Sequence, residues 1–276
     1  MKSFGLACVA LLCTVLIYST LSFPEWGSPD TPASEHVSDY YIKNAVKDTA
    51  VPNLVTAVLA DYRGYDTLFE TAVILTAGFA CFFLLRRYKR RQPPYRLYRH
   101  IDTGVTLIIE KGGKEPTDSE EFMRIDSQWV PYDLVIQKAA RLMIPFLQLF
   151  ALYVVFHGHH SPGGGFQGGV ILGATLILLA IANDLRSTTK RIPERISAQL
   201  ASAGVLVYAG TGALCLLLGA NFLNYSALSR LIATNPVMAR SHGILLVEIG
   251  VAIAVSAVMI WIYYNLVSAG RHDEGL

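Results

Sequence analysis

Residues 243–267, GILLVEIGVAIAVSAVMIWIYYNLV, contain a single charged side chain, Glu248, in an otherwise apolar run. A bilayer core is about 30 Å thick and requires about 20 consecutive apolar residues in each helix that crosses it. This run therefore predicts a transmembrane helix. We expect an all-α integral membrane protein with about six transmembrane helices, because five other runs meet the same criterion, at about residues 4–22, 66–85, 135–156, 168–184 and 200–222.

The composition of the whole chain agrees with a membrane protein. Of its 276 residues, 53% are apolar and only 16% are charged, and the mean hydropathy is +0.40. These values argue against a soluble enzyme and against a disordered chain. The four Cys residues all lie in apolar runs, where a thiol usually acts as a small apolar side chain. A net charge of +2 gives no reason to expect nucleic acid as a partner.

The first apolar run, at about residues 4–22, has two interpretations. Lys2 before it and the small residues between positions 19 and 22 also fit a cleaved signal peptide. No clean small-x-small cleavage site follows the run, so we favour a retained membrane anchor.

Basic residues set the expected orientation in the membrane. The segment 86–99, which follows the second predicted helix, has seven basic side chains and no acidic one. Basic loops stay on the cytoplasmic side, so this segment is predicted to be cytoplasmic. Alternation of the helices then places both termini in the cytoplasm. The loop 185–199, with four basic residues, falls on the same side.

Residues 102–133 interrupt the apolar pattern with an acid-rich stretch. Within it, residues 104–110 have a short β-like pattern that is followed by Lys111-Gly-Gly-Lys114. This pattern predicts a small cytoplasmic hairpin or a partner-binding linker. We therefore expect a two-helix module at 1–97, a cytoplasmic acidic linker at 98–130 and a four-helix module at 131–276.

Charged side chains within the apolar runs are the first candidates for function, because an ionised group in hydrocarbon costs several kcal/mol. Glu248 lies inside the last predicted helix. Asp66 and Glu70 are one turn apart near the outer end of the second, so both carboxylates project from one face. Pairing with a basic group or backbone on a neighbouring helix is an equally good interpretation of Glu70 and Glu248. Lys138 and Arg141, in the first turns of the third helix, are expected to extend toward the head groups.

The segment His157–Gly169, HGHHSPGGGFQGG, lies between the third and fourth predicted helices. Its glycines match the letters G-x-G-x-x-G, but no strand precedes them and no Gly-Lys-Ser/Thr follows, so we reject dinucleotide and phosphate loops. His157, His159 and His160 lack the Cys or carboxylate partners that a zinc site needs, so no metal is expected. Consecutive glycines predict a short re-entrant or tightly packed loop, whose histidines either pass protons or are hydrogen-bonded at the interface.

Four stretches of the chain resemble components of one family of transporters. Asp133–Gln137, Leu152–Val170 and His242–Val251 closely resemble the B subunit of Mrp-type multisubunit cation/proton antiporters, and the Pro-Gly-Gly-Gly-Phe core of the loop is highly specific to that family. Pro52–Glu70 is similar to the carboxy-terminal part of the large A subunit, which is a separate E-type subunit in membrane-bound hydrogenases. The chain thus resembles an E-type subunit fused to a B-type subunit.

The resemblance implies roles residue by residue. Glu70 is similar to the intramembrane glutamate of the A/E segment, and Glu248 falls on the last-helix acid of hydrogenase-type relatives. No residue is expected to be catalytic. The ion-translocation candidates are Asp66, Glu70, His157, His159 and Glu248, and the other motif residues, expected to be structural, are Asp61, Arg63, Lys138, Arg141, Pro162, Gly163, Gly164, Gly165 and Phe166.

The resemblance also implies an accessory subunit of a Na⁺/H⁺ antiporter module in the inner (plasma) membrane, within a membrane-bound hydrogenase or related respiratory complex. The implied partners are A-, C-, D-, E-, F- and G-type antiporter subunits, nickel-iron hydrogenase subunits and lipid. Na⁺ and H⁺ are the expected transported ions. No bound cofactor is expected, because the sequence has no Cys cluster or metal quartet. Three alternatives stay open: a purely structural scaffold, a component of a free-standing Mrp antiporter, and an enzyme that acts on a lipid or quinone.

Overall fold

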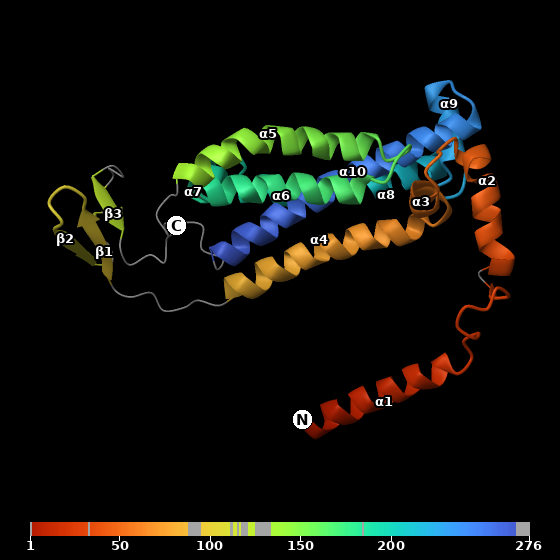
Figure 1. Ribbon diagram of the computed structural model, residues 1–276, viewed down its shortest axis with the longest axis horizontal. Coiled ribbons are helices and arrows are strands. Elements are labelled where there is room, and N and C mark those ends of the chain that lie inside the picture. Colours follow the sequence, from red (N-terminus) through yellow and green to blue (C-terminus); the bar gives the residue numbers. More distant parts are fainter. Residues whose placement is uncertain are drawn as a thin grey trace. The chain divides into compact units, whose positions relative to one another are not determined.

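The computed structural model describes residues 2–32, 34–87, 95–110, 113–114, 116, 121–124, 134–183 and 185–268 (Figure 1). The chain forms two compact units, residues 1–45 and 46–276, which we describe separately.

The first unit is built on one apolar helix, α1, Lys2–Thr20. All of its side chains from residue 4 onward are exposed within the unit. Three of its hydroxyl groups, on Thr14, Ser19 and Thr20, donate hydrogen bonds to carbonyls three or four residues earlier. These bonds satisfy the polar side chains inside the helix itself, as a lipid environment requires. A π-helical turn, η1, Ser34–Ser38, leads into α2, Asp39–Thr49, which crosses into the second unit.

Among the described residues of the second unit, five long helices form a bundle. The last of them, α10, occupies the centre of the bundle and packs against α4, α6 and α8, while α5 packs against α6 (Figure 1). In the most apolar part of α10, 72% of the residues are buried, against at most 39% in the other four helices. The five helices are α4, Gly64–Arg87; α5, Leu134–Phe156; α6, Gly165–Asn183; α8, Glu194–Leu217; and α10, Pro236–Val267.

The sequence of α10 explains its central position. Asn235 caps its first turn by accepting a hydrogen bond from the backbone N–H of Met238, and Pro236 follows as the first helical residue. A helix that is apolar on all sides is stable where neighbours surround it. Gly204 of α8 and Gly250 of α10 meet where these helices cross, so the two backbones approach closely.

Short elements connect the long helices. At the end of the bundle where α4 begins, α3, Leu54–Ala57, runs into the π-helical turn η2, Val58–Tyr62. The 3₁₀ turn η3, Tyr225–Leu228, and α9, Ser229–Ile232, connect α8 to α10, and α7, Leu185–Arg191, connects α6 to α8. Two buried tyrosines link these elements by hydrogen bonds. The Tyr208 hydroxyl of α8 donates to the carbonyl of Gly64, at the start of α4, at 2.8 Å. The Tyr225 hydroxyl of η3 donates to the carbonyl of Ala60, in η2, at 3.0 Å.

A small antiparallel sheet has strand order β2-β1-β3 and consists of β1, Tyr95–His100, β2, Thr106–Glu110, and β3, Phe122–Arg124. The register of the first pair places Tyr95 opposite Glu110. The strand expected within 104–110 is therefore confirmed as β2, which forms a hairpin with β1. Much of the acid-rich stretch 102–133, including Asp133, lies outside the described residues.

Five of the six predicted transmembrane segments fall on the five long helices, each of which is long and apolar enough to cross a membrane. The sixth falls on α1, whose apolar part, Phe4–Thr20, is shorter. The fold is thus that of a multi-pass membrane protein, and the count of six spans stays a prediction, as do the module boundaries at 97 and 131. Two helices begin earlier than predicted. Helix α8 begins directly after Pro193 rather than at about residue 200, and α10 begins after the Asn235 cap rather than at residue 243.

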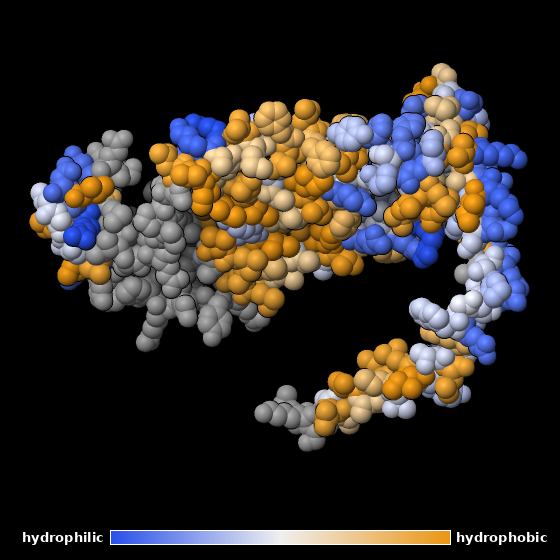
Figure 2. Space-filling model, viewed as in Figure 1, coloured by the Kyte–Doolittle hydropathy of each residue, from blue (hydrophilic) through white to orange (hydrophobic). Residues whose placement is uncertain are grey.

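The distribution of hydropathy over the surface agrees with this assignment. Hydrophobic side chains cover the middle of the helical bundle in Figure 2, and hydrophilic side chains gather at the end that carries α3. This pattern is expected of helices whose middle faces lipid or other apolar helices and whose ends meet water.

Candidate functional site

A buried glutamate and a buried histidine meet where α10 passes the loop between α5 and α6. Glu248 of α10 is 8% exposed and His159 of the loop is 9% exposed. The Nδ1 atom of His159 lies 3.8 Å from the Oε2 atom of Glu248. Both atoms are buried and have no hydrogen-bond partner among the described residues. The tertiary structure therefore places two titratable groups beside each other away from water.

The hydrogen bond of the other ring nitrogen, Nε2, indicates which tautomer His159 adopts. Its Nε2 lies 3.0 Å from the backbone carbonyl of Ser241, which can only accept, so Nε2 carries the hydrogen. Burial lowers the pKa of His159, and electrostatic interaction with His160 and His242 lowers it further, while the hydrogen bond to Ser241 raises it by less than burial lowers it. The imidazole is therefore neutral at neutral pH, and its Nδ1 lone pair faces the carboxyl group of Glu248.

Glycines of the loop bring its backbone against α10. A Cβ atom on Gly165 would lie 2.0 Å from the backbone oxygen of Glu248, and one on Gly164 would lie 2.8 Å from its Oε1 atom. Gly164 also has a φ of +131°, which L side chains rarely adopt. The backbone N–H of Gly165 donates a hydrogen bond to the Glu248 carboxylate. The prediction of a tightly packed loop is confirmed at these two positions.

The segment that leads into α3 also holds this loop in place. The side-chain amide of Asn53 donates to the carbonyls of Gly158 and Ser161, each at 2.8 Å, and its backbone N–H donates to the carbonyl of His159 at 2.9 Å. The Thr56 hydroxyl donates to the Gly158 carbonyl at 2.9 Å. Residues from the predicted N-terminal module thus position a loop of the predicted C-terminal module.

Sequence reasoning missed Asn53 and Thr56. An asparagine directly before a helical run is typical of an N-cap, and Asn53 does accept a hydrogen bond from the backbone N–H of Val55. That local signal indicates the start of α3. It contains no information on the loop, which is more than a hundred residues away along the chain.

Replacing Asn53 by Ala is expected to destabilise the second unit by about 2–3 kcal/mol. The change removes the helix cap and leaves the buried carbonyl of Gly158 with one donor fewer. Thermal unfolding of the detergent-purified protein measures the effect. Asn44→Ala is the matched control, because Asn44 is partly exposed on α2 and, within the part of the chain that the structure describes, its amide donates only to the carbonyl of Tyr40 in the same helix. Equal melting temperatures of the two variants would contradict the positioning role.

A second buried contact joins η2 to α10. Asp61, whose side chain is 4% exposed, forms an ion pair with Arg240, and the guanidinium of Arg240 also lies over the ring of Tyr62, 5.8 Å from its centroid. Burial raises the pKa of Asp61 by more than the neighbouring Arg240 lowers it. Asp61, expected from its motif to be structural, therefore lies in a charged contact between two segments that are 179 residues apart.

The acids of α4 lie outside both contacts. Asp66 pairs with Arg63 at the helix start, and both side chains of this pair are largely exposed. Glu70 is exposed and has no hydrogen-bond or ion-pair partner among the described residues. The ion-translocation candidates therefore do not form one cluster: His159 and Glu248 meet, and Asp66 and Glu70 do not join them.

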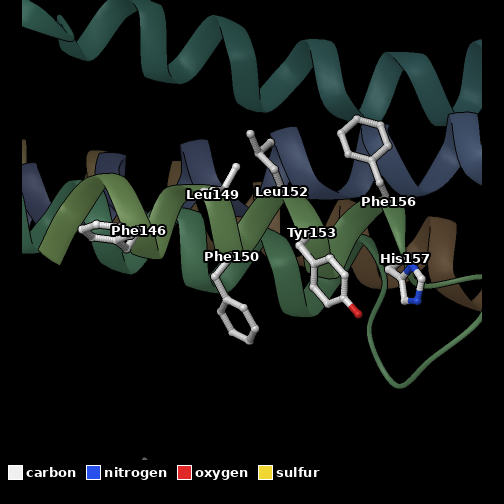
Figure 3. Close-up of a pocket in the computed structure, with 7 residues that line it drawn as sticks. All are labelled: Phe146, Leu149, Phe150, Leu152, Tyr153, Phe156 and His157. Atoms are coloured by element: carbon white, nitrogen blue, oxygen red, sulfur yellow. The ribbon is translucent and has the colours of Figure 1, made fainter.

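His157 is separated from His159 although the two are close in sequence. Its ring stacks on Tyr153, with centroids 4.8 Å apart, at one end of an open groove of about 700 Å³ along α5 (Figure 3). All seven lining side chains come from α5 and the turn after it: Phe146, Leu149, Phe150, Leu152, Tyr153, Phe156 and His157. The histidines of the loop thus divide between an outer groove and the buried pair.

The remaining predicted residues lie at the surface or in the backbone of the loop. Lys138 and Arg141 are exposed in the first two turns of α5. Pro162 and Phe166 are exposed, while Gly163 is close to α5, since a Cβ atom on it would lie 2.8 Å from the carbonyl oxygen of Val154. Among the described residues, no group of three or more His, Cys, Asp or Glu side chains is arranged to hold a metal ion.

Two family descriptions match the chain in separate segments. The family described as a domain related to the MnhB subunit of Na⁺/H⁺ antiporters matches residues 135–261. The family described as the E subunit of MBH matches residues 7–96.

Three curated relatives are named as antiporter components. A probable K⁺/H⁺ antiporter A/B subunit of Rhizobium meliloti is 26% identical over 182 residues, which are 66% of this chain and 17% of the relative. The B subunit of a Na⁺/H⁺ antiporter of Bacillus subtilis is 36% identical over 94 residues, 34% of this chain and 65% of the relative. The antiporter protein mnhB2 of Staphylococcus aureus is 30% identical over 141 residues, 50% of this chain and 96% of the relative. The chain thus spans less than two thirds of the length of the first two relatives.

Two solved structures share the fold. A chain of the membrane-bound sulfane sulfur reductase, an archaeal respiratory membrane complex, aligns with a TM-score of 0.58 at 24% identity, covering 96% of this chain and 98% of that one. A chain of the Mrp complex from Dietzia aligns with a TM-score of 0.60 at 23% identity, covering all of this chain and 27% of that one.

Proposed function

This chain belongs to the family of B-type subunits of Na⁺/H⁺ antiporters, and on that premise we propose that it is an accessory membrane subunit of a cation/proton antiporter module in which Glu248 and His159 exchange a proton. The observation that carries the proposal is the contact inside the helical bundle between Nδ1 of His159 and Oε2 of Glu248, which lie 3.8 Å apart and have no hydrogen-bond partner among the described residues. Intramembrane acids are costly unless they serve a function or are paired.

The chemistry of the pair favours protons over metal cations as its cargo. Neutral His159 presents a lone pair at Nδ1, and a protonated Glu248 presents an O–H donor. One proton can therefore be shared between them once the two side chains move slightly closer together. Hard cations such as Na⁺ prefer several oxygen ligands, by analogy with Ca²⁺ and Mg²⁺. We therefore assign proton handling to this chain and propose that Na⁺ or K⁺ is bound by other subunits of the module.

The assembly that we propose is a membrane-bound hydrogenase or a related respiratory complex. The match of residues 7–96 to the E subunit of MBH and the shared fold with two membrane complexes support it. In this assembly A-, C-, D-, F- and G-type antiporter subunits and a nickel-iron subunit would be the neighbours. The basic segment 86–99 supports cytoplasmic termini in the plasma membrane.

The second candidate function is that of a structural scaffold. Contacts between the predicted N-terminal and C-terminal modules favour it. Asp61 is paired with Arg240, and Asn53 holds the loop 157–161, so these groups serve packing. In a scaffold, the Glu248–His159 contact would have the same role.

Removing this chain tests the proposal as a whole. We expect that vesicles from cells lacking the chain lose cation-dependent proton exchange, and that the full-length chain supplied in trans restores it. Inverted membrane vesicles with a fluorescent ΔpH probe provide the measurement, and purified complexes with and without the chain show whether the other antiporter subunits still assemble. Unchanged exchange in the deletion strain would contradict both the transport and the scaffold proposals.

A further inference from the structure

Helix α4 has one face toward the bundle and one face away from it. Gly64, Thr71 and Gly78 are buried on the inner face, where Gly78 contacts Trp261 of α10. The opposite face has exposed side chains at a spacing of three and four residues. We call these the outer stripe of α4, and they are Glu70, Val73, Ala77, Ala80 and Leu84. Only 11% of the most apolar part of α4 is buried within the chain, the lowest value of the five long helices.

Lipid alone is a poor environment for this face. Glu70 lies six residues after the start of α4, which at 1.5 Å per residue is about 9 Å along the axis. A carboxylate side chain is short, and at that depth it costs several kcal/mol in hydrocarbon unless a partner neutralises it. No described residue of the chain supplies such a partner.

The shape of the outer stripe fits another helix. A repeat of three and four residues is the spacing with which two helices pack at a crossing angle of about 20°. Ala77 and Ala80, in the middle of the stripe, let the two backbones approach closely, as small residues do in membrane helix pairs. Glu70 adds a negative charge near one end of the stripe.

We propose that the outer stripe of α4 binds a transmembrane helix of another subunit, and that this helix places a Lys or Arg side chain opposite Glu70. The proposal rests on the proposed function only in that the chain is one subunit of a larger assembly. It gives Glu70 a role that sequence reasoning left open between transport and structure.

Two other occupants fit the charge less well. A second copy of the chain, paired about a two-fold axis in the same membrane, would place two Glu70 carboxylates near each other, which is repulsive. Helix α1 of the same chain has one basic residue, Lys2. Lys2 precedes the apolar run of α1 in the sequence, whereas Glu70 lies within the apolar part of α4.

Photo-crosslinking in the purified complex tests the proposal. With p-benzoylphenylalanine at Ala77 or Leu84, we expect an adduct between this chain and a transmembrane segment of a different subunit, identified by mass spectrometry. The matched control carries the same group at Trp261 of α10, which is 2% exposed and packs within the chain against Phe79 with centroids 5.1 Å apart, and should give no intermolecular adduct. An adduct with lipid, with α1 or with a second copy of this chain would overturn the proposal, as would equal adducts at position 261.

Charge reversal provides an independent readout. We expect that Glu70→Lys lowers the amount of the cross-linked subunit that co-purifies by about tenfold. Replacing the basic residue on the helix of that subunit by an acidic one should then restore co-purification. Retention of the partner by Glu70→Lys, or a captured segment without a basic residue near the contact, would refute the pairing. Neither experiment depends on ion transport, so a failure of the Glu248 mechanism leaves this inference separately testable.

Discussion

Replacing Glu248 by Gln is expected to lower cation-dependent proton exchange by about tenfold or more while the complex still assembles. Glutamine has nearly the same shape and can still accept the hydrogen bond from the backbone N–H of Gly165, but it cannot release a proton to Nδ1 of His159. The measurement is the initial rate of ΔpH collapse in inverted vesicles after addition of Na⁺ or K⁺, normalised to the amount of assembled complex.

Glu194→Gln is the matched control for this experiment. Its Oε1 atom accepts hydrogen bonds from the indole of Trp261 and the amide of Asn265, both at 3.0 Å, and a glutamine oxygen can accept the same bonds. We expect exchange close to that of the unchanged protein. Full exchange in an assembled Glu248→Gln complex would instead support the scaffold interpretation, because a shared proton would then be unnecessary.

The largest effect on folding is expected for Gly165→Ala. The added Cβ atom would lie 2.0 Å from the backbone oxygen of Glu248, so α6 and α10 must separate at the point where the loop meets the buried pair. Overpacking against backbone costs about 3 kcal/mol or more, which corresponds to a loss on the order of 10 °C in Tm. Thermal unfolding in detergent, followed by the tryptophan fluorescence of the protein, measures the change.

Gly210→Ala is the matched control, which shows the effect of replacing a glycine by alanine where no overpacking results. Gly210 lies within α8 and has no atom within 4 Å of an added Cβ, so alanine there should be neutral or stabilise the helix by up to about 1 kcal/mol. A Tm of Gly165→Ala close to that of Gly210→Ala would show that the loop can move away from α10, and it would contradict the close packing that we describe.

The membrane helices and the unusual acid were predictable from the sequence because both are local properties. Long apolar runs require a lipid or protein environment whatever the rest of the chain does, and five of the six predicted segments coincide with long helices. Glu248 is recognisable as an exception within such a run, and the glycines at 163–165 indicate close backbone approach. Helix ends were less accurate, since caps such as Asn235 act outside the apolar pattern.

The grouping of the candidate residues was not predictable, because it depends on contacts between segments far apart in the chain. His157, His159 and His160 are chemically equal in the sequence, yet only His159 reaches Glu248, while His157 stacks on Tyr153. Likewise, the charge pattern does not show that Asp61 pairs with Arg240 or that Glu70 stays exposed. The sequence by itself determined which segments enter the membrane, since the transfer free energy of each run is a sum over its own residues. Only the tertiary structure decided which polar groups meet, because that depends on how α4, α5, α6 and α8 pack around α10.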